Sequence, residues 1–330
     1  MMPNKETALN LLRGMERIRL VEEGIAERYP QGKMRCPTHL SIGQEASAMA
    51  VGAALTKSDL AVSSHRAHAH YLAKSGCLNA MLAEIYGKAT GCCRGRGGSM
   101  HLTDSAAGFV GSTAIVGNSV PIGVGLALSL QLKKQNNVCA VFFGDGCVEE
   151  GSFYESVNFA VVRNLPVLFV CENNLYSVYS PLKVRQPAGR QIFKMVEAMG
   201  ITSGIADGNN IEAAYLAALN AIEHIRSGQG PFFLELTTYR WLEHCGPNYD
   251  NHIGYRDEKE FLSWQTKDPI PAYQKVLQSR GWLTQDDTLQ MRTQLLAEID
   301  AAFEYAEESP FPIQAEAFSD EYANAEENIQ

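Results

Sequence analysis

Residues 138–174 form the segment that most restricts how this chain can fold. A short apolar run, Val138 to Phe143, is typical of a buried strand, and a second such run covers 166–171. Between the two runs, apolar side chains recur at helical spacing over 149–164. This order predicts two parallel neighbouring strands joined by a right-handed helical crossover. We therefore expect an α/β fold with a mainly parallel sheet and helices on both faces.

Polar side chains follow both strands of this unit. Asp145 lies between Gly144 and Gly146 after the first strand, and Asn174 follows the second. Ligands of open α/β sheets bind at this carboxyl edge, and flanking glycines let the backbone approach a diphosphate closely. One carboxylate and one amide oxygen suit Mg²⁺ shared with a diphosphate. Gly-Asp-Gly alone would favour an ordinary turn with a capping Asp, but the later Asn favours a metal–diphosphate site.

Further motifs extend this interpretation over most of the chain. They lie at 39–46, 66–68, 96–101, 115–117, 172–176, 228–231, 238–240, 255–256 and 267–270. In these motifs and their order, the chain resembles the alpha subunit of the thiamine-diphosphate-dependent decarboxylating component of 2-oxo acid dehydrogenase complexes, of the pyruvate, branched-chain and acetoin types. The resemblance covers roughly residues 8–312.

The resemblance implies a thiamine-diphosphate-binding fold and a specific assembly. Residues 1–330 would form a single diphosphate-binding domain with a C-terminal helical extension and an acidic tail at about 309–330. The cofactors would be thiamine diphosphate and Mg²⁺. A separate beta subunit would supply the pyrimidine-binding domain and its catalytic Glu, in a two-alpha, two-beta heterotetramer. A lipoyl acyltransferase component and a small 2-oxo acid are the other implied partners.

The resemblance also assigns roles to single residues. The backbone carbonyl of Tyr176 would join Asp145 and Asn174 as a metal ligand. Arg66, which follows a predicted strand, would clamp the cofactor diphosphate with its guanidinium. The expected cofactor-binding residues are Arg66, Ala114, Val116, Gly144, Asp145, Gly146, Cys147, Asn174, Val178 and His244.

Two histidines are the catalytic candidates by resemblance, His244 on a loop beside the cofactor and His68 lining the site. Cys245 stands where a phosphorylated Ser often follows the catalytic His, so we do not expect phosphorylation there. His65 stands where the family usually has Tyr, and His39 would border the substrate. Gln44 and Glu45 are expected to be structural, at a subunit contact.

Metal and redox alternatives are disfavoured by spacing. His65, His68 and His70 could form a zinc cluster, but no Cys or carboxylate lies at matching spacing and closed zinc sites need four ligands. The eight Cys show neither metal-type nor disulfide-framework spacing. We expect them to be reduced thiols of a cytoplasmic protein.

Three functions remain open from the sequence. The leading one is oxidative decarboxylation of a 2-oxo acid such as pyruvate, with acyl transfer to a lipoyl group. The unusual loop from Trp241 to Tyr255 motivates an alternative, a carbon–carbon transferase that passes the decarboxylated unit to an aldehyde or ketone, including a sugar. A non-catalytic scaffold is the third, and the presence of Asp145, Asn174, Arg66 and His244 weighs against it.

Charge and hydropathy exclude other classes. The net charge of −9 is spread along the chain, which argues against nucleic acid as a partner. No apolar run approaches the roughly 18 to 20 residues of a membrane helix. The helical pattern begins almost at the first residue, so we expect neither a secretory signal nor a transit segment.

Overall fold

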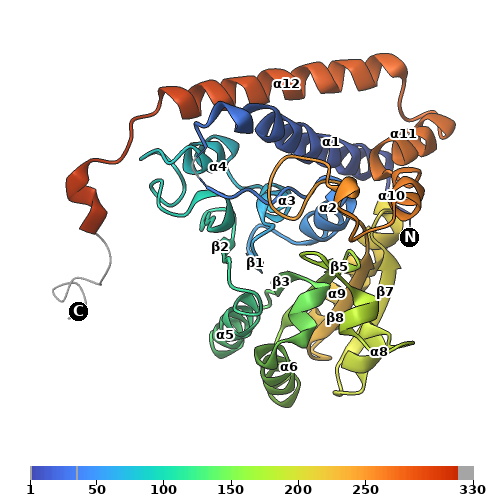
Figure 1. Cartoon of the computed structure of the whole chain (residues 1–330). Coiled ribbons are helices and arrows are strands. Elements are labelled where there is room, and N and C mark those ends of the chain that lie inside the picture. Colours follow the sequence, from blue (N-terminus) through green and yellow to red (C-terminus); the bar gives the residue numbers. More distant parts are fainter. Residues whose placement is uncertain (1, 35, 319–330) are drawn as a thin grey trace.

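A single parallel sheet of six strands forms the centre of the chain (Figure 1). The computed structural model describes residues 2–34 and 36–318, so the 319–330 part of the expected acidic tail lies outside the described residues. The strand order is β2-β1-β3-β4-β8-β7, and every neighbouring pair is parallel. The strands are β1 (Leu60–Ser63), β2 (Phe109–Ser112), β3 (Cys139–Gly144), β4 (Val167–Asn173), β7 (Thr202–Asp207) and β8 (Phe232–Thr237). A two-stranded antiparallel ribbon, β5 (Tyr176–Ser177) and β6 (Ser180–Pro181), adjoins it.

The strand–helix–strand unit predicted from the sequence is confirmed. β3 leads through the short helix η3 (Asp145–Glu149) into α6 (Gly151–Arg163), which returns the chain to β4. β3 and β4 pair in parallel, with Gly144 opposite Glu172. Asp145 and Asn174 therefore emerge side by side, because parallel strands end at the same edge of the sheet.

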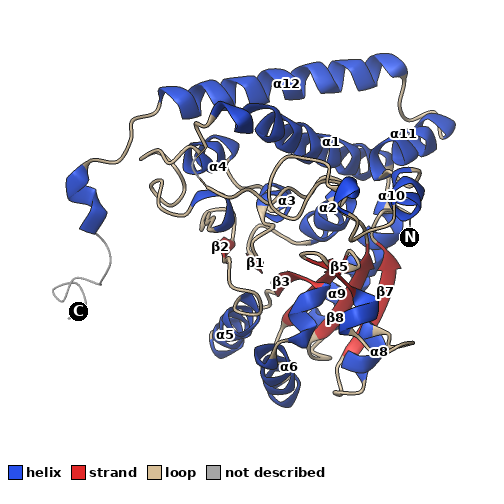
Figure 2. Cartoon of the chain, in the orientation of Figure 1, coloured by secondary structure: helices blue, strands red, loops and turns tan. Residues whose placement is uncertain are grey.

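The period of two along each strand divides the core into two layers. In β3, Ala140 and Phe142 pack with the cluster that includes α1, α2 and α9, whereas Val141 and Phe143 pack with the one formed by α5 and α6. Helices thus cover both faces of the sheet, as expected (Figure 2). The first layer contains α1 (Lys5–Arg28), α2 (Glu45–Ala54), α3 (His68–Ala73), α4 (Leu78–Ile85) and α9 (Ile211–Arg226). The second contains α5 (Ser119–Leu132), α6 and α8 (Ile192–Glu197).

Three C-terminal helices pack over the first layer. They are α10 (Glu258–Gln265), α11 (Pro269–Ser279) and α12 (Gln285–Glu308), and α12 crosses α1 and α4 (Figure 1). α12 begins at a capping box in which Thr284 and Asp287 bond reciprocally. The chain then leads away from the body to η5 (Gln314–Phe318). Within residues 2–34 and 36–318, no helix combines the length and apolar character needed to cross a bilayer.

Several elements differ from the sequence expectations. The segment 91–113, whose many glycines are typical of a long loop, contains β2 and the short helix η2 (Gly98–Met100). β7 and α3 were not expected at all. The remaining short helices are η1 (Tyr29–Gln31), α7 (Leu182–Arg185) and η4 (Asn251–Ile253).

Candidate functional site

The main cavity of interest lies where the strand order changes direction. β1 and β3 are neighbours in the sheet, and the chain leaves them toward opposite edges. Such a switch point opens a crevice outside the carboxyl ends of the strands. The cavity there is lined by His39, Gln44, Ser64, His65, Arg66, Met100, Ala114, Val116, Gly117, Gly144, Asp145, Gly146, Cys147, Glu172, Asn174, Tyr176, Ser177, Val178 and His244. All of the expected cofactor- and metal-binding residues are therefore brought together.

Asp145 is buried at the end of β3, and its two carboxylate oxygens have different surroundings. Oδ2 pairs with the guanidinium of Arg185, which also bonds Glu149 and the carbonyl of Ser180. Oδ1 is buried and has no hydrogen-bond partner in the described part of the chain. Burial raises the pKa of Asp145, and Arg185 opposes that rise. One carboxylate oxygen thus remains available for a cation.

Small residues keep this edge of the cavity open. A Cβ atom on Gly146 would lie 2.5 Å from Oγ of Ser177, closer than real Cβ contacts. Gly117 adopts φ +84, a conformation that side chains disfavour. Cys147 is buried beside them, and burial raises the pKa of its thiol to about 12, so it remains uncharged. A ligand can therefore approach the backbone around Asp145 closely, and no thiolate lies there to compete with Asp145 for a cation.

Asn174 presents a second oxygen beside Asp145. Its Oδ1 accepts a hydrogen bond from the backbone N–H of Tyr176 at 3.2 Å, and its Nδ2 donates to Oε1 of Gln44 at 2.8 Å. Leu175 has φ +73, and this left-handed residue turns the chain so that Tyr176 also lines the cavity. Oxygen-only ligands, one of them an unpaired buried carboxylate oxygen, fit a hard cation such as Mg²⁺.

Arg66 supplies the fixed positive charge of the site. It follows β1 and donates to the carbonyls of Leu40 at 2.5 Å and His244 at 3.1 Å. Burial lowers the pKa of Arg66 to about 10, which leaves it cationic at neutral pH. A buried guanidinium that faces an open cavity is suited to an anion such as a diphosphate.

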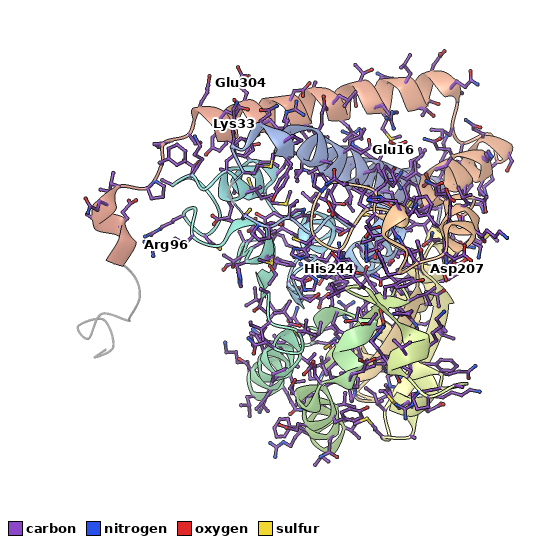
Figure 3. The ribbon with its side chains drawn as sticks, viewed as in Figure 1. Glu16, Lys33, Arg96, Asp207, His244 and Glu304 are labelled. Atoms are coloured by element: carbon purple, nitrogen blue, oxygen red, sulfur yellow. The ribbon has the colours of Figure 1, made fainter. Side chains whose placement is uncertain are left out.

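Three imidazoles surround Arg66. The rings of His39, His65 and His244 lie 4.6 to 5.3 Å apart, centroid to centroid. Burial, with Arg66 adding to it, lowers the pKa of His39 to about 2, of His65 to about 4 and of His244 to about 3. All three are neutral near pH 7, so each ring can donate one hydrogen bond and accept another. Figure 3 shows His244 where the helical layer meets the carboxyl edge of the sheet.

His68 does not reach this cavity, contrary to the expectation that it lines the site. Its side chain is fully buried, with Nε2 2.8 Å from Oγ of Ser99 and Nδ1 3.3 Å from Oε1 of Glu22. His70 points elsewhere, toward Glu172 and Ser63. The zinc cluster of His65, His68 and His70, which the spacing disfavoured, is not assembled in the described residues.

Gln44 and Glu45 also differ from expectation, because neither lies at the surface. Gln44 is 1% exposed and lines the cavity, and Glu45 pairs with the buried Arg19. Glu172, two residues before Asn174 in sequence, was also missed as a cavity residue. The motif His39–Ala46 was a signal for Gln44, but only the tertiary contact of Gln44 with Glu172 near the end of β4 reveals the direction of its side chain.

The outer rim of the cavity is apolar and exposed. Val116 is 43% exposed, Val178 is 41% exposed, and neighbouring Ile115 is 64% exposed. Ala114 lines the cavity beside Val116. This rim leads to α5, which carries no charged residue over its whole length, although Ile122 and Leu132 are exposed. Uncharged apolar surface of this kind marks a protein interface.

The fold and site define a class: an α/β protein with an anion- and cation-binding cavity at a topological switch point. Residues 13–314 match the family model described as "Dehydrogenase E1 component". The chain belongs to this family.

Full-length relatives support the assignment. The alpha subunit of the pyruvate dehydrogenase E1 component of Rickettsia felis is 34% identical over 320 residues, 97% of each chain. The alpha subunit of acetoin:2,6-dichlorophenolindophenol oxidoreductase of Bacillus subtilis is 37% identical over 322 residues, 98% of this chain and 95% of the relative. The chloroplastic pyruvate dehydrogenase E1 subunit alpha-3 of Arabidopsis thaliana is 32% identical over 326 residues, 97% of this chain and 75% of the relative.

Proposed function

We propose that this chain is the alpha subunit of a thiamine-diphosphate-dependent 2-oxo acid dehydrogenase, which decarboxylates a 2-oxo acid such as pyruvate and transfers the acyl unit to a lipoyl group. One observation carries the proposal: in a chain of the E1 family, Oδ1 of Asp145, which has no partner among residues 2–34 and 36–318, and the amide of Asn174 lie together at the switch point. The names of the relatives support the reaction class.

The cofactor-binding residues form two groups: those that would bind the metal cation and those that would bind thiamine diphosphate itself. Asp145, Asn174 and the carbonyl of Tyr176 would hold Mg²⁺, and Arg66 would bind the diphosphate that shares it. The backbone of Gly144, Gly146 and Cys147 would lie along that diphosphate, while Ala114, Val116 and Val178 would contact the cofactor rings. When bound, thiamine diphosphate supplies the electron sink that decarboxylation of a 2-oxo acid requires.

The neutral His244 would hold or move a proton for the acceptor. Arg66 donates to the backbone carbonyl of His244 and lies 3.4 Å from its Nδ1, which restrains the ring. A low pKa keeps this imidazole unprotonated at neutral pH, so one ring nitrogen is free to accept a hydrogen bond from the acceptor. We assign His68 no direct contact with substrate, because Ser99 and Glu22 surround it.

The proposed partner is a beta subunit, in a two-alpha, two-beta heterotetramer. The exposed apolar rim at Val116 and Val178 and the uncharged helix α5 support a protein cover over this side of the cavity. The relatives are alpha subunits by name, which supports the same partner. A lipoyl acyltransferase component is proposed as the next partner in the reaction. We also propose a cytoplasmic location, supported by eight free cysteines.

The experiment uses the chain co-purified with its beta subunit, thiamine diphosphate and Mg²⁺. Consumption of pyruvate, 2-oxobutyrate, branched-chain 2-oxo acids and acetoin is followed with and without a lipoyl domain. Lipoyl-dependent turnover of a 2-oxo acid is the expected result. Decarboxylation that ignores the lipoyl domain would favour the carbon–carbon transferase. Absence of any turnover, with cofactor shown to be bound, would favour the scaffold.

A further inference from the structure

We propose that Gln44 is a positioning residue that fixes which face of the Asn174 side chain meets the metal ion. The proposal rests on the proposed function, because it concerns the metal site assigned there. Gln44 precedes α2, is 1% exposed and lies 130 residues from Asn174 in sequence. It contacts Asn174 on one side and Glu172 on the other.

Glu172 determines the orientation of the Gln44 amide. Nε2 of Gln44 donates to Oε2 of Glu172 at 3.4 Å, and Nε2 of His70 lies 3.1 Å from the same oxygen. A carboxylate can only accept hydrogen bonds. The NH₂ group of Gln44 must therefore face Glu172, and its Oε1 must face away from it.

Gln44 in turn determines the orientation of Asn174. Oε1 of Gln44 accepts from Nδ2 of Asn174 at 2.8 Å, so the NH₂ group of Asn174 faces Gln44. Oδ1 of Asn174 then lies on the opposite side, where the N–H of Tyr176 donates to it at 3.2 Å. Gln44 and the N–H of Tyr176 select the same orientation of the Asn174 amide. In the flipped amide, the NH₂ group would face the N–H of Tyr176 and Oδ1 would face Oε1 of Gln44.

The orientation matters because only the oxygen of an amide can ligate Mg²⁺. A freely flipping Asn174 would present its NH₂ group to the ion for part of the time. Partners that orient metal ligands typically affect metal affinity 10- to 100-fold when they are removed. Because Glu172 can only accept hydrogen bonds, it orients the amide of Gln44. Gln44 in turn orients Asn174 so that its oxygen, and not its NH₂ group, faces the metal ion.

The test measures Mn²⁺ affinity directly, from the electron paramagnetic resonance signal of free Mn²⁺. The sample is the full chain co-purified with its beta subunit, at a fixed concentration of thiamine diphosphate. Gln44→Met removes both hydrogen bonds at nearly constant volume and should weaken Mn²⁺ about tenfold. Ser47→Ala is the matched control, because it removes a buried hydrogen bond to the Gln44 carbonyl without facing Asn174.

A second background separates orientation from general damage. In an Asn174→Asp variant, either side of the group offers an oxygen, so adding Gln44→Met should change Mn²⁺ affinity less than about twofold or even improve it. A merely structural role for Gln44 would give the same loss in both backgrounds and would overturn the proposal.

Asn174→Ala distinguishes this proposal from the proposed function. If Asn174→Ala leaves Mn²⁺ affinity unchanged, the metal site itself is misassigned. If Asn174→Ala weakens binding but Gln44→Met does not, only the role of Gln44 fails.

Discussion

Arg185 pairs with Oδ2 of Asp145, whereas Oδ1 of the same buried carboxylate has no partner within the described residues. The two residues lie 40 positions apart, and α7, the short helix that ends at Arg185, follows the β5–β6 ribbon. The guanidinium thus partly offsets the burial of Asp145 while leaving one oxygen for a metal ion. The Arg185–Asp145 pair therefore determines how strongly protons compete with the metal ion for the carboxylate of Asp145.

Removing this cation should make metal binding more sensitive to pH. In Arg185→Met, burial is no longer opposed and the pKa of Asp145 rises further. Protons then compete more strongly, so metal affinity should fall faster between pH 8 and 6 than in wild type, toward the limit of about tenfold per pH unit for one proton. Mn²⁺ titrations at pH 6, 7 and 8 measure this. Arg190→Met, in the segment that follows α7, is the control, and parallel curves for Arg185→Met and wild type would disprove the effect.

The Arg19–Glu45 pair should be essential for folding stability. Glu45 is fully buried, and Arg19 bonds it through two nitrogens while also contacting Asp268. Arg19→Met leaves a buried carboxylate without its partner, which costs about 3–5 kcal/mol. Chemical denaturation should show that loss. Arg17→Met, which removes an exposed pair with Glu298, should cost no more than about 1 kcal/mol, and equal losses would contradict the assignment.

The cavity histidines should destabilise the chain in acid. A histidine with a lowered folded-state pKa binds its proton more readily when unfolded, so stability falls as pH drops below its ordinary value of 6.5. His65→Phe should reduce that slope between pH 6.5 and about 4, by at most about 1.4 kcal/mol per pH unit. Denaturation curves across this range measure it, with the exposed His101→Phe as control. An unchanged slope would mean that His65 is not held neutral.

Replacement of His244 should separate two steps of the reaction. His244→Asn keeps a polar side chain beside Arg66 but cannot accept a proton at neutral pH. We expect decarboxylation, followed with an artificial oxidant, to fall less than transfer to a lipoyl domain, by about tenfold or more. Both rates are measured on the reconstituted pair. An equal loss in both assays would place the role of His244 before the acceptor step.

The central strands could be predicted from the sequence, and the edge strands could not. β3, β4 and β8 are buried on both faces, so their apolar runs stand out. β2 and β7 form the two edges of the sheet, and each contains a glycine and is partly exposed. Their sequences resemble loops because their pairing comes from the neighbouring strand rather than from their own apolar pattern.

The site residues also separate into those that could be predicted from the sequence and those that could not. Asp145 and Asn174 could be paired in advance, because a crossover places the ends of two parallel strands together. Gln44 could not be placed, since it lies 130 residues from Asn174 in sequence and only the tertiary fold brings the two side chains together. His68 was misplaced for a similar reason: it begins the unexpected helix α3, which turns its ring toward Ser99 and away from the cavity.

The most direct test of the account is calorimetric titration of thiamine diphosphate into the chain co-purified with its beta subunit. Wild type should bind the cofactor in Mg²⁺ and lose most of that affinity when EDTA removes the ion. Asp145→Asn should remain folded by circular dichroism, yet bind at least 100-fold more weakly in Mg²⁺, because it loses the charged metal ligand. Equal affinity with and without Mg²⁺, or in wild type and Asp145→Asn, would show that Asp145 does not hold a metal–diphosphate cofactor.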